Sequence, residues 1–527
     1  MTTVSRRAFL EAVGAAAGSG AMYRAATALG LMAAPEAMAA TELGRLDGER
    51  RHVIILGAGI SGLTAAWELK KAGYDFTILE ASHRAGGRNM TLRSGDVIDE
   101  VGNRQICQFD DEPHLYFNCG PARIPQDHTM LVDYCRELGV ELEPFVNENR
   151  NAFLQWDDAF GGQPVRARQY FADARGFMTE LMSKAVLDDA VDMPFDGVDA
   201  ETFLQFLRTY GDLDPDYVYK GTNRAGYESG GFIVHGKLKE TWDFSDILDS
   251  GFWRFAMHWG EGADQAAAMM QPVGGMDRVV KGFTDRVGDR MLLRAPVRQI
   301  RNTEDGVEVT YESDGALNRI RGDFCINCIP THLVTGVDHN FGPQYTRALH
   351  APKAGKLFKI GYQMSRRFWE EDERIFGGIS WTGQEITQLW YPSHGFFKQK
   401  GIVLGAYTFG MRGGDAFAPL SPAERLDEAL RQAEKIHPDI RNYVENGVSV
   451  PWHRMNHMLG CSARWTPEDE RDFYKVLQAP EGRHYMVGDQ ISHHSGWQEG
   501  AMRSAHHALA DIDRRVQAEL KGDAVTA

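Results

Sequence analysis

The sequence is poor in cysteine and has no excess of positive charge. Its 527 residues include six cysteines and carry a formal net charge of -16. An acidic balance argues against a polyanion-binding surface, so we predict no nucleic-acid partner. The pair Cys325-x-x-Cys328 lies in an apolar, strand-like run without a second pair at metal-ligand spacing. We therefore expect buried thiols and no metal site, and the cysteine spacing requires no disulfide.

The sequence also lacks an uninterrupted apolar run at its N-terminus. The segment SRRAFL at residues 5–10 precedes a Gly/Ala-rich stretch that ends in AMA at residues 37–39. This arrangement resembles a twin-arginine export signal. A membrane anchor is the alternative, but glycines together with Tyr23 and Arg24 interrupt the stretch, which disfavours a stable spanning helix. We predict a removable signal peptide at residues 1–39, a periplasmic or secreted protein, and no stable membrane insertion.

The rest of the chain has an ordinary globular composition. It is 43% hydrophobic and 10% aromatic, which excludes intrinsic disorder and allows two or three packed units. Residues 53–56 form an apolar run typical of a buried parallel strand. Glycines at G-x-G-x-x-G spacing come next, namely Gly57, Gly59 and Gly62.

A helix is expected over residues 61–72, directly after this glycine turn. Its free N–H groups and the positive end of its dipole would face a pyrophosphate. Glu80 ends the following apolar strand, where a carboxylate accepts hydrogen bonds from an adenosine ribose and disfavours a 2′-phosphate. The complete strand, turn, helix and acid predict a dinucleotide site more strongly than the glycines alone.

The residues after Glu80 narrow the cofactor. The pattern E-x-x-x-R-x-G-G-R, with Arg84 and Arg88 as its arginines, resembles the signature of the flavin-dependent amine oxidase superfamily. That resemblance implies FAD and an α/β fold: a Rossmann-like FAD-binding domain of amine-oxidase type, a mixed-sheet substrate domain and a helical insertion. It also implies cofactor contacts at Gly57, Gly59, Ile60, Ser61, Gly62, Glu80, Ala81, Arg84, Gly87, Arg88, Val297, Gly488, Asp489 and Trp497.

Later motifs follow in the order typical of the superfamily, which assigns domains to the chain. The FAD-binding domain is expected at residues 48–105, 266–340 and 466–515, and the substrate domain at residues 106–150 and 341–465. Residues 151–265 have helical periodicity and many aromatics, so we predict a helical domain there. In the family such an insertion covers the entrance to the active site.

Within the superfamily the sequence is most similar to the L-amino-acid oxidases. They carry a G-P-x-R-x-P segment whose arginine binds the substrate α-carboxylate, and Arg123 stands at that place. An aromatic-Tyr-Pro segment implies Tyr391 as the second carboxylate donor. Its neighbour Trp390 is the alternative, because adjacent strand residues face opposite sides. The resemblance further implies that Gly496 accepts the substrate amine and that Trp497 walls the pocket.

Two further residues concern the flavin. Lys359 lies ten residues before Trp369, which resembles the spacing of the superfamily lysine that holds a water at flavin N5. The alternative is a lysine that points to solvent on an alternating strand. Ser462 aligns with the position of a flavin-bound cysteine, and Cys461 falls one residue early, so we predict noncovalent FAD. The adjacent histidines His493 and His494 are interpreted as structural.

The resemblance implies oxidative deamination of L-amino acids. A hydride would pass from Cα to FAD N5, O2 would reoxidise the flavin, and the products would be a 2-oxo acid, ammonia and hydrogen peroxide. Aromatic residues favour large neutral or aromatic substrates, although an acidic residue in the helical domain would favour basic ones. An amine oxidase, a decarboxylating L-amino-acid monooxygenase and a noncatalytic FAD-binding protein are the alternatives. Family members commonly form homodimers, and we expect one here.

Overall fold

The computed structural model describes residues 43–46, 50–188, 190, 199–410 and 413–522. The predicted signal peptide at residues 1–39 lies outside them. The chain divides into two compact units, one formed by Arg45–Ala508 and the other by Met1–Gly44 with Leu509–Ala527. The site described below belongs entirely to the first unit. None of the described helices combines the length and apolar character needed to cross a bilayer.

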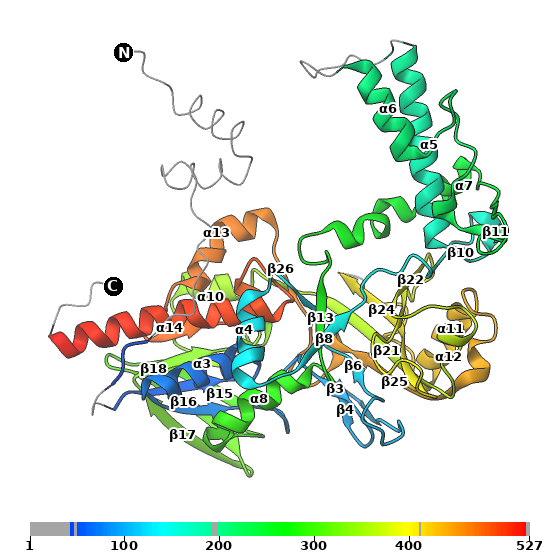
Figure 1. Ribbon diagram of the computed structural model, residues 1–527. Helices are drawn as coiled ribbons and strands as arrows, with labels where there is room; N and C mark the ends of the chain where they lie inside the picture. Colours follow the sequence, from blue (N-terminus) through cyan, green and yellow to red (C-terminus); the bar gives the residue numbers. More distant parts are fainter. Residues whose placement is uncertain (1–42, 47–49, 189, 191–198, 411–412, 523–527) are drawn as a thin grey trace, which may run out of the picture. The chain divides into compact units, whose positions relative to one another are not determined.

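The predicted nucleotide motif forms the centre of a parallel sheet (Figure 1). The sheet has the order β14-β2-β1-β18-β27, with β1 (His52–Leu56), β2 (Asp75–Leu79), β14 (Met291–Leu292), β18 (Phe324–Asn327) and β27 (His484–Met486). In β1, Ile55 faces helix α3 (Ile60–Ala72), whereas Ile54 and Leu56 join the hydrophobic core on the other side. Because both faces are buried, residues 53–56 of the strand are all apolar, as the sequence predicted, whereas His52 begins the strand and is half-buried.

The hydrophobic core that contains Ile54 and Leu56 is completed by a β-meander and by helices from distant parts of the chain. The antiparallel meander comprises β15 (Val297–Asn302), β16 (Val307–Ser313) and β17 (Ala316–Gly322), and β19 (Asp338–His339) pairs with β15 in parallel. The helices that contribute to this core are α9 (Thr331–Val334), α10 (Pro343–Leu349) and α13 (Pro467–Gln478). Helix α8 (Asp277–Val287) contacts α3, and α14 (Gln498–Lys521) follows β27 in the chain. Tyr345 of α10 and Leu477 of α13 pack with Ile54 in one cluster. The nucleotide sheet is therefore buried by residues far apart in sequence.

A mixed sheet forms the main body of the predicted substrate domain. Its order is β10-β9-β22-β23-β24-β21-β25, and its strands are β9 (Phe153–Gln155), β10 (Val165–Arg166), β21 (Lys356–Met364), β22 (Gly378–Thr382), β23 (Gln388–Tyr391), β24 (Gly401–Gly410) and β25 (Val444–Pro451). A smaller sheet contains β7 (Ile124–Pro125), β8 (Leu142–Phe145) and β13 (Met269–Pro272). Helices α4 (Thr129–Leu138), α11 (Phe368–Glu371) and α12 (Pro422–Ala433) accompany these sheets.

The segment at residues 151–265 contains the helices α5 (Ala167–Leu187), α6 (Ala200–Gly211) and α7 (Phe244–Asp249) (Figure 1). Tyr170 and Phe252 lie in its hydrophobic core, where their rings are 5.0 Å apart. Its first two strands, β9 and β10, belong to the mixed sheet, so the helical part begins after them. The remaining strands form pairs: β3 (Thr91–Leu92) with β6 (Phe117–Asn118), β4 (Val97–Glu100) with β5 (Asn103–Ile106), β11 (Tyr227–Ser229) with β12 (Lys237–Leu238), and β20 (Lys353–Ala354) with β26 (Ala463–Arg464).

Candidate active site

The turn between β1 and α3 forms a backbone cradle. Gly57 has a φ of 98°, and its N–H donates to the carbonyl oxygen of Leu79 at 2.8 Å. A Cβ on Gly62 would lie 2.1 Å from the carbonyl oxygen of Gly57, so α3 can begin this close to the turn only with glycine. A Cβ on Gly59 would meet nothing within 4 Å, which leaves space for a ligand against the backbone. The residues therefore fit the pyrophosphate of a dinucleotide.

Glu80 lies just after β2, and two backbone N–H groups hold its carboxylate. Ala58 donates to Oε2 and Ser82 donates to Oε1, both at 2.7 Å. The side chain is buried and borders a cavity. Because carboxylate oxygens have further lone pairs, Glu80 can accept hydrogen bonds from ribose hydroxyls without releasing the backbone.

The cavity has a volume of about 450 Å³ and follows this cradle. It is bordered by most of the predicted cofactor residues, namely Gly57, Gly59, Ile60, Ser61, Glu80, Ala81, Gly87, Arg88, Val297, Gly488, Asp489 and Trp497, and by Gly496. Gly62 packs α3 against the turn and does not border the cavity. Arg84 donates to the carbonyl oxygens of Ala85 at 3.0 Å and Gly87 at 2.7 Å, so it stabilises the turn that contains Gly87. It does not border the cavity, although a cofactor contact was predicted for it.

An ion pair between Arg88 and Asp489 forms part of the cavity wall. Both Nη atoms of Arg88 donate to the Asp489 carboxylate, and Nη1 also donates to the carbonyl oxygen of Cys461. Asp489 in turn accepts the N–H of Gly496 at 2.8 Å. The pair thus connects the end of the first motif to the loop before α14, which contains two of the predicted substrate residues.

Arg123 is a buried cation without an anionic partner among the described residues. Its guanidinium packs against the indole rings of Trp390 at 4.8 Å, Trp259 at 5.4 Å and Trp497 at 5.7 Å. Its Nε and Nη2 both donate to the neutral amide oxygen of Gln265, at 3.1 and 2.7 Å. Burial lowers the pKa of Arg123 to about 10. A guanidinium removed from water needs an anion, and a carboxylate is the anion that its two parallel donors match.

The structure contradicts the predicted role of Tyr391. Its hydroxyl lies 2.8 Å from Ser380 Oγ and 2.6 Å from His437 Nε2, inside the core of the mixed sheet. Because side chains alternate along β23, Trp390 faces the other way and contacts Arg123. The alternative residue is therefore the one beside the arginine. Tyr407 of β24 borders the cavity and replaces Tyr391 as the candidate hydroxyl donor.

Lys359 is buried on β21 and does not point to solvent. Its Nζ donates to the carbonyl oxygen of Gly120 at 2.6 Å and of Asn118 at 3.3 Å. It lies 4.7 Å from the ring centroid of Tyr407 and does not border the cavity itself. Burial lowers the pKa of Lys359 to about 7, although Cys119 opposes this shift. The side chain can therefore change between ammonium and neutral amine near neutral pH.

Cys461, rather than Ser462, borders the main cavity. Ser462 borders a smaller neighbouring cavity. Burial raises the pKa of the Cys461 thiol, an effect that Arg88 opposes, so the thiol form is favoured. All six cysteines of the sequence are free thiols in the structure.

Sequence reasoning missed the residues that surround Arg123 from other segments. Gln265 and Trp259 lie at the end of the helical segment and Tyr407 lies on β24, and no motif marks any of them. It also missed a cluster of His128, Asp264 and His494, whose potential ligand atoms all lie within 4.8 Å of one another. These residues give no spacing signal in the sequence, because each of them comes from a different part of the chain.

The comparison with known families agrees with this geometry. The family model described as flavin containing amine oxidoreductase matches residues 60–512. The chain belongs to this family. It is 26% identical to an L-amino-acid oxidase of Echis ocellatus over 486 residues, which are 88% of this chain and 89% of the relative. An L-amino-acid oxidase of Pseudechis australis is 24% identical over 489 residues, with 88% and 87% covered.

Solved structures show the same fold. A cysteine variant of putrescine oxidase superposes with a TM-score of 0.60 at 21% identity, covering 88% of this chain and 99% of its own. The cyclohexylamine oxidase of Brevibacterium oxydans IH-35A gives a TM-score of 0.60 at 18% identity, with 89% and 99% covered. The fold expected from the sequence, an α/β flavin-binding domain with a substrate domain, is therefore confirmed. Membership of the flavin containing amine oxidoreductase family implies a flavin cofactor.

The buried lysine predicts a pH-dependent stability. The pKa of Lys359 is about 7 in the folded protein and 10.5 ordinarily, so between these values the unfolded chain holds more protons. The free energy of unfolding should therefore gain a contribution that grows as pH rises from 7 to 10.5. Lys359→Met should remove this rise, which denaturant unfolding at several pH values measures.

Lys356→Met is the matched control, because Lys356 lies on the same strand but pairs with Asp415 at the surface. The absolute stability of Lys359→Met also includes the lost hydrogen bonds to two carbonyl oxygens, so the pH dependence is the relevant quantity. Equal pH dependence in the wild type and Lys359→Met would contradict the lowered pKa.

Proposed function

We propose that this protein oxidatively deaminates L-amino acids, with FAD as the flavin and O2 as the electron acceptor, and releases a 2-oxo acid, ammonia and hydrogen peroxide. The observation that carries the proposal is the buried guanidinium of Arg123, which has no carboxylate partner among the described residues and lies between aromatic rings near the flavin cavity. An amine oxidase acting on a substrate without a carboxylate would have no use for this cation.

The chain contributes orientation, exclusion of water and proton handling. Arg123 would bind the α-carboxylate, which competes with Gln265 wherever it uses Nε and Nη2, and Tyr407 is placed to add a hydroxyl donor. Trp497 walls the pocket, and the carbonyl group of Gly496 remains the predicted acceptor for the substrate amine. These contacts fix one enantiomer with its Cα hydrogen toward the cofactor. When bound, the flavin supplies the acceptor for that hydride and passes two electrons to O2.

We also propose that the flavin is FAD and that it binds without a covalent link. The glycine cradle fits a pyrophosphate and Glu80 fits a ribose, and both groups belong to the dinucleotide form. Cys461 borders the cavity, but burial favours its thiol form over the reactive thiolate.

Large neutral or aromatic L-amino acids are the proposed substrates. The surroundings of Arg123 are indole rings, and the acidic residues that border the cavity, Glu80 and Asp489, are already engaged by backbone N–H groups or Arg88. The leader at residues 1–39 supports a proposed periplasmic or secreted location. A homodimer is proposed on the resemblance to the family.

A substrate panel tests the reaction. With the purified yellow protein, L-phenylalanine should give peroxide and ammonia in equal amounts, whereas D-phenylalanine and phenylethylamine should give neither, because only the L-amino acid presents both carboxylate and hydrogen correctly. Oxygen uptake, peroxide and ammonia are measured together. Turnover of phenylethylamine at the rate of L-phenylalanine would identify an amine oxidase, an amide product would identify a monooxygenase, and a flavin that no amino acid bleaches would identify a binding protein.

Replacement of the arginine tests the carboxylate site. Arg123→Ala should raise KM for L-phenylalanine by the equivalent of about 2 to 5 kcal/mol, because the substrate carboxylate is then desolvated without a partner. Arg123→Lys should recover only part of the loss, since an ammonium lacks the two parallel donors. Steady-state kinetics at saturating O2 give KM, and the flavin absorbance verifies cofactor content. An unchanged KM in Arg123→Ala would remove this residue from the substrate site.

Acid precipitation tests the cofactor linkage. Trichloroacetic acid should release all of the flavin into the supernatant, where chromatography should identify it as FAD, because no covalent bond retains it. Cys461→Ser should release the same amount. Yellow colour that stays with the wild-type precipitate and is lost from that of Cys461→Ser would show a bond at Cys461.

A further inference from the structure

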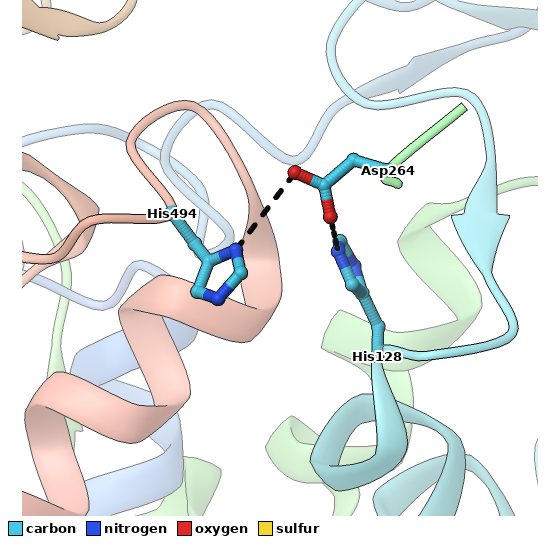
Figure 2. Close-up of side chains that lie close together, drawn as sticks. All are labelled: His128, Asp264 and His494. Carbon is cyan, nitrogen blue, oxygen red and sulfur yellow. Dashed lines mark hydrogen bonds and ion pairs between the residues drawn. The ribbon is translucent and has the colours of Figure 1, made fainter. Parts of the chain in front are cut away.

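Three polar side chains from separate segments, His128, Asp264 and His494, converge in the structure (Figure 2). Asp264 lies between two imidazoles and directs one carboxylate oxygen toward each. Its Oδ1 is 3.0 Å from His128 Nε2, and its Oδ2 is 3.9 Å from His494 Nδ1. His128 precedes α4, Asp264 ends the helical segment, and His494 lies in the loop before α14.

The ligand types and their spacing suit a divalent transition metal. Two imidazole nitrogens and one carboxylate form a set that zinc-like ions prefer, and with three protein ligands a fourth position stays open for water. The three candidate ligand atoms already lie within 4.8 Å of one another, so small side-chain rotations would bring them to one ion.

The cluster is accessible from solvent on one side. His128 is buried, with 2% of its side chain exposed, whereas Asp264 and His494 are exposed by 34% and 45%. An ion could therefore enter without unfolding the site. Magnesium and calcium should bind poorly, because they prefer oxygen ligands.

The cluster is joined directly to the residues that hold Arg123. Asp264 directly precedes Gln265, whose amide oxygen accepts hydrogen bonds from Nε and Nη2 of the Arg123 guanidinium. His128 also packs edge-on against Trp497, with ring centroids 4.9 Å apart. A substrate carboxylate that binds side-on, at Nε and Nη2, competes with Gln265 for those two donors. An ion that fixes Asp264 would restrain the displacement of Gln265.

We propose that His128, Asp264 and His494 form a site for a zinc-like divalent ion, and that metal binding there opposes substrate binding by holding Gln265 on Arg123. The effect on substrate rests on the proposed function, whereas the metal site does not. The sequence predicts no metal site, because its cysteines lack metal-ligand spacing and His494 has the pattern of a structural residue.

Cobalt absorbance tests the site independently of activity. FAD-loaded protein is freed of metal with a chelator and then titrated with Co²⁺. The visible spectrum of the protein without Co²⁺ is subtracted from each spectrum, which removes the flavin absorbance. We expect saturation at one Co²⁺ per chain and displacement by Zn²⁺ but not by Mg²⁺. His494→Asn and Asp264→Asn should abolish the signal, whereas His493→Asn, an exposed neighbour, should retain it. No signal in the wild type, or a signal that survives in both cluster variants, would overturn the site.

Kinetics test the coupling. Zn²⁺ should raise KM for L-phenylalanine about fivefold or more with little change in kcat, within the range of ordinary coupling between two sites. The increase should vanish in His494→Asn and persist in His493→Asn. An unchanged KM at saturating Zn²⁺, in protein that shows the cobalt signal, would overturn the coupling. A cobalt signal in protein that oxidises no amino acid would retain the site and reject the proposed function instead.

Discussion

The burial of the Arg123 guanidinium is the constraint on which the active site depends. A cation removed from water is tolerated when its donors are satisfied and its faces are covered. In this chain Gln265 accepts from two donors of the guanidinium and indole rings cover its faces, so the charge is shielded from water but is not paired with an anion. The same arrangement leaves the charge available to a carboxylate, and this distinguishes the site from one built for a simple amine.

The flavin cavity depends instead on glycines, because a side chain at these positions would obstruct either the packing of the turn or the ligand. Gly62 lets α3 start against the turn, and Gly59 leaves the backbone open to a ligand. Around this cradle the polar groups are pre-oriented: backbone N–H groups hold Glu80, and Arg88 holds Asp489. Both carboxylates thus keep their positions without the cofactor, which limits the reorganisation needed when it binds.

Most of the predicted cofactor residues border one cavity, whereas the predicted substrate residue Tyr391 lies in the core, and this difference has a physical reason. The strand, glycine turn, helix and Glu80 are close along the chain, so their local patterns carry the geometry. Which face of β23 is core depends on His437 and Ser380, and the position of Tyr391 could not be found from its own segment. Arg123 was identified by its motif, but its partner Gln265 lies 142 residues away and only the folded chain reveals it.

The predicted buried thiols and the buried lysine show the same difference between features that follow from the local sequence and features that depend on distant residues. The apolar run around Cys325 indicated a buried strand, and that residue is buried in β18. For Lys359 the pattern allowed an inward or an outward side chain. The structure decides between them because carbonyl oxygens near Gly120 accept its hydrogen bonds. Periodicity predicts burial, whereas the satisfaction of a buried polar group depends on a distant partner.

The strand order of the nucleotide sheet also bears on biosynthesis. Its central strand β1 lies near the start of the described chain, and the edge strand β27 together with the Asp489 side of the cavity lies near the end. A ribosome therefore has to synthesise the chain beyond β27 before the wall around the flavin can close. Retention of the yellow cofactor would then report that the last strand of the nucleotide sheet has joined the others.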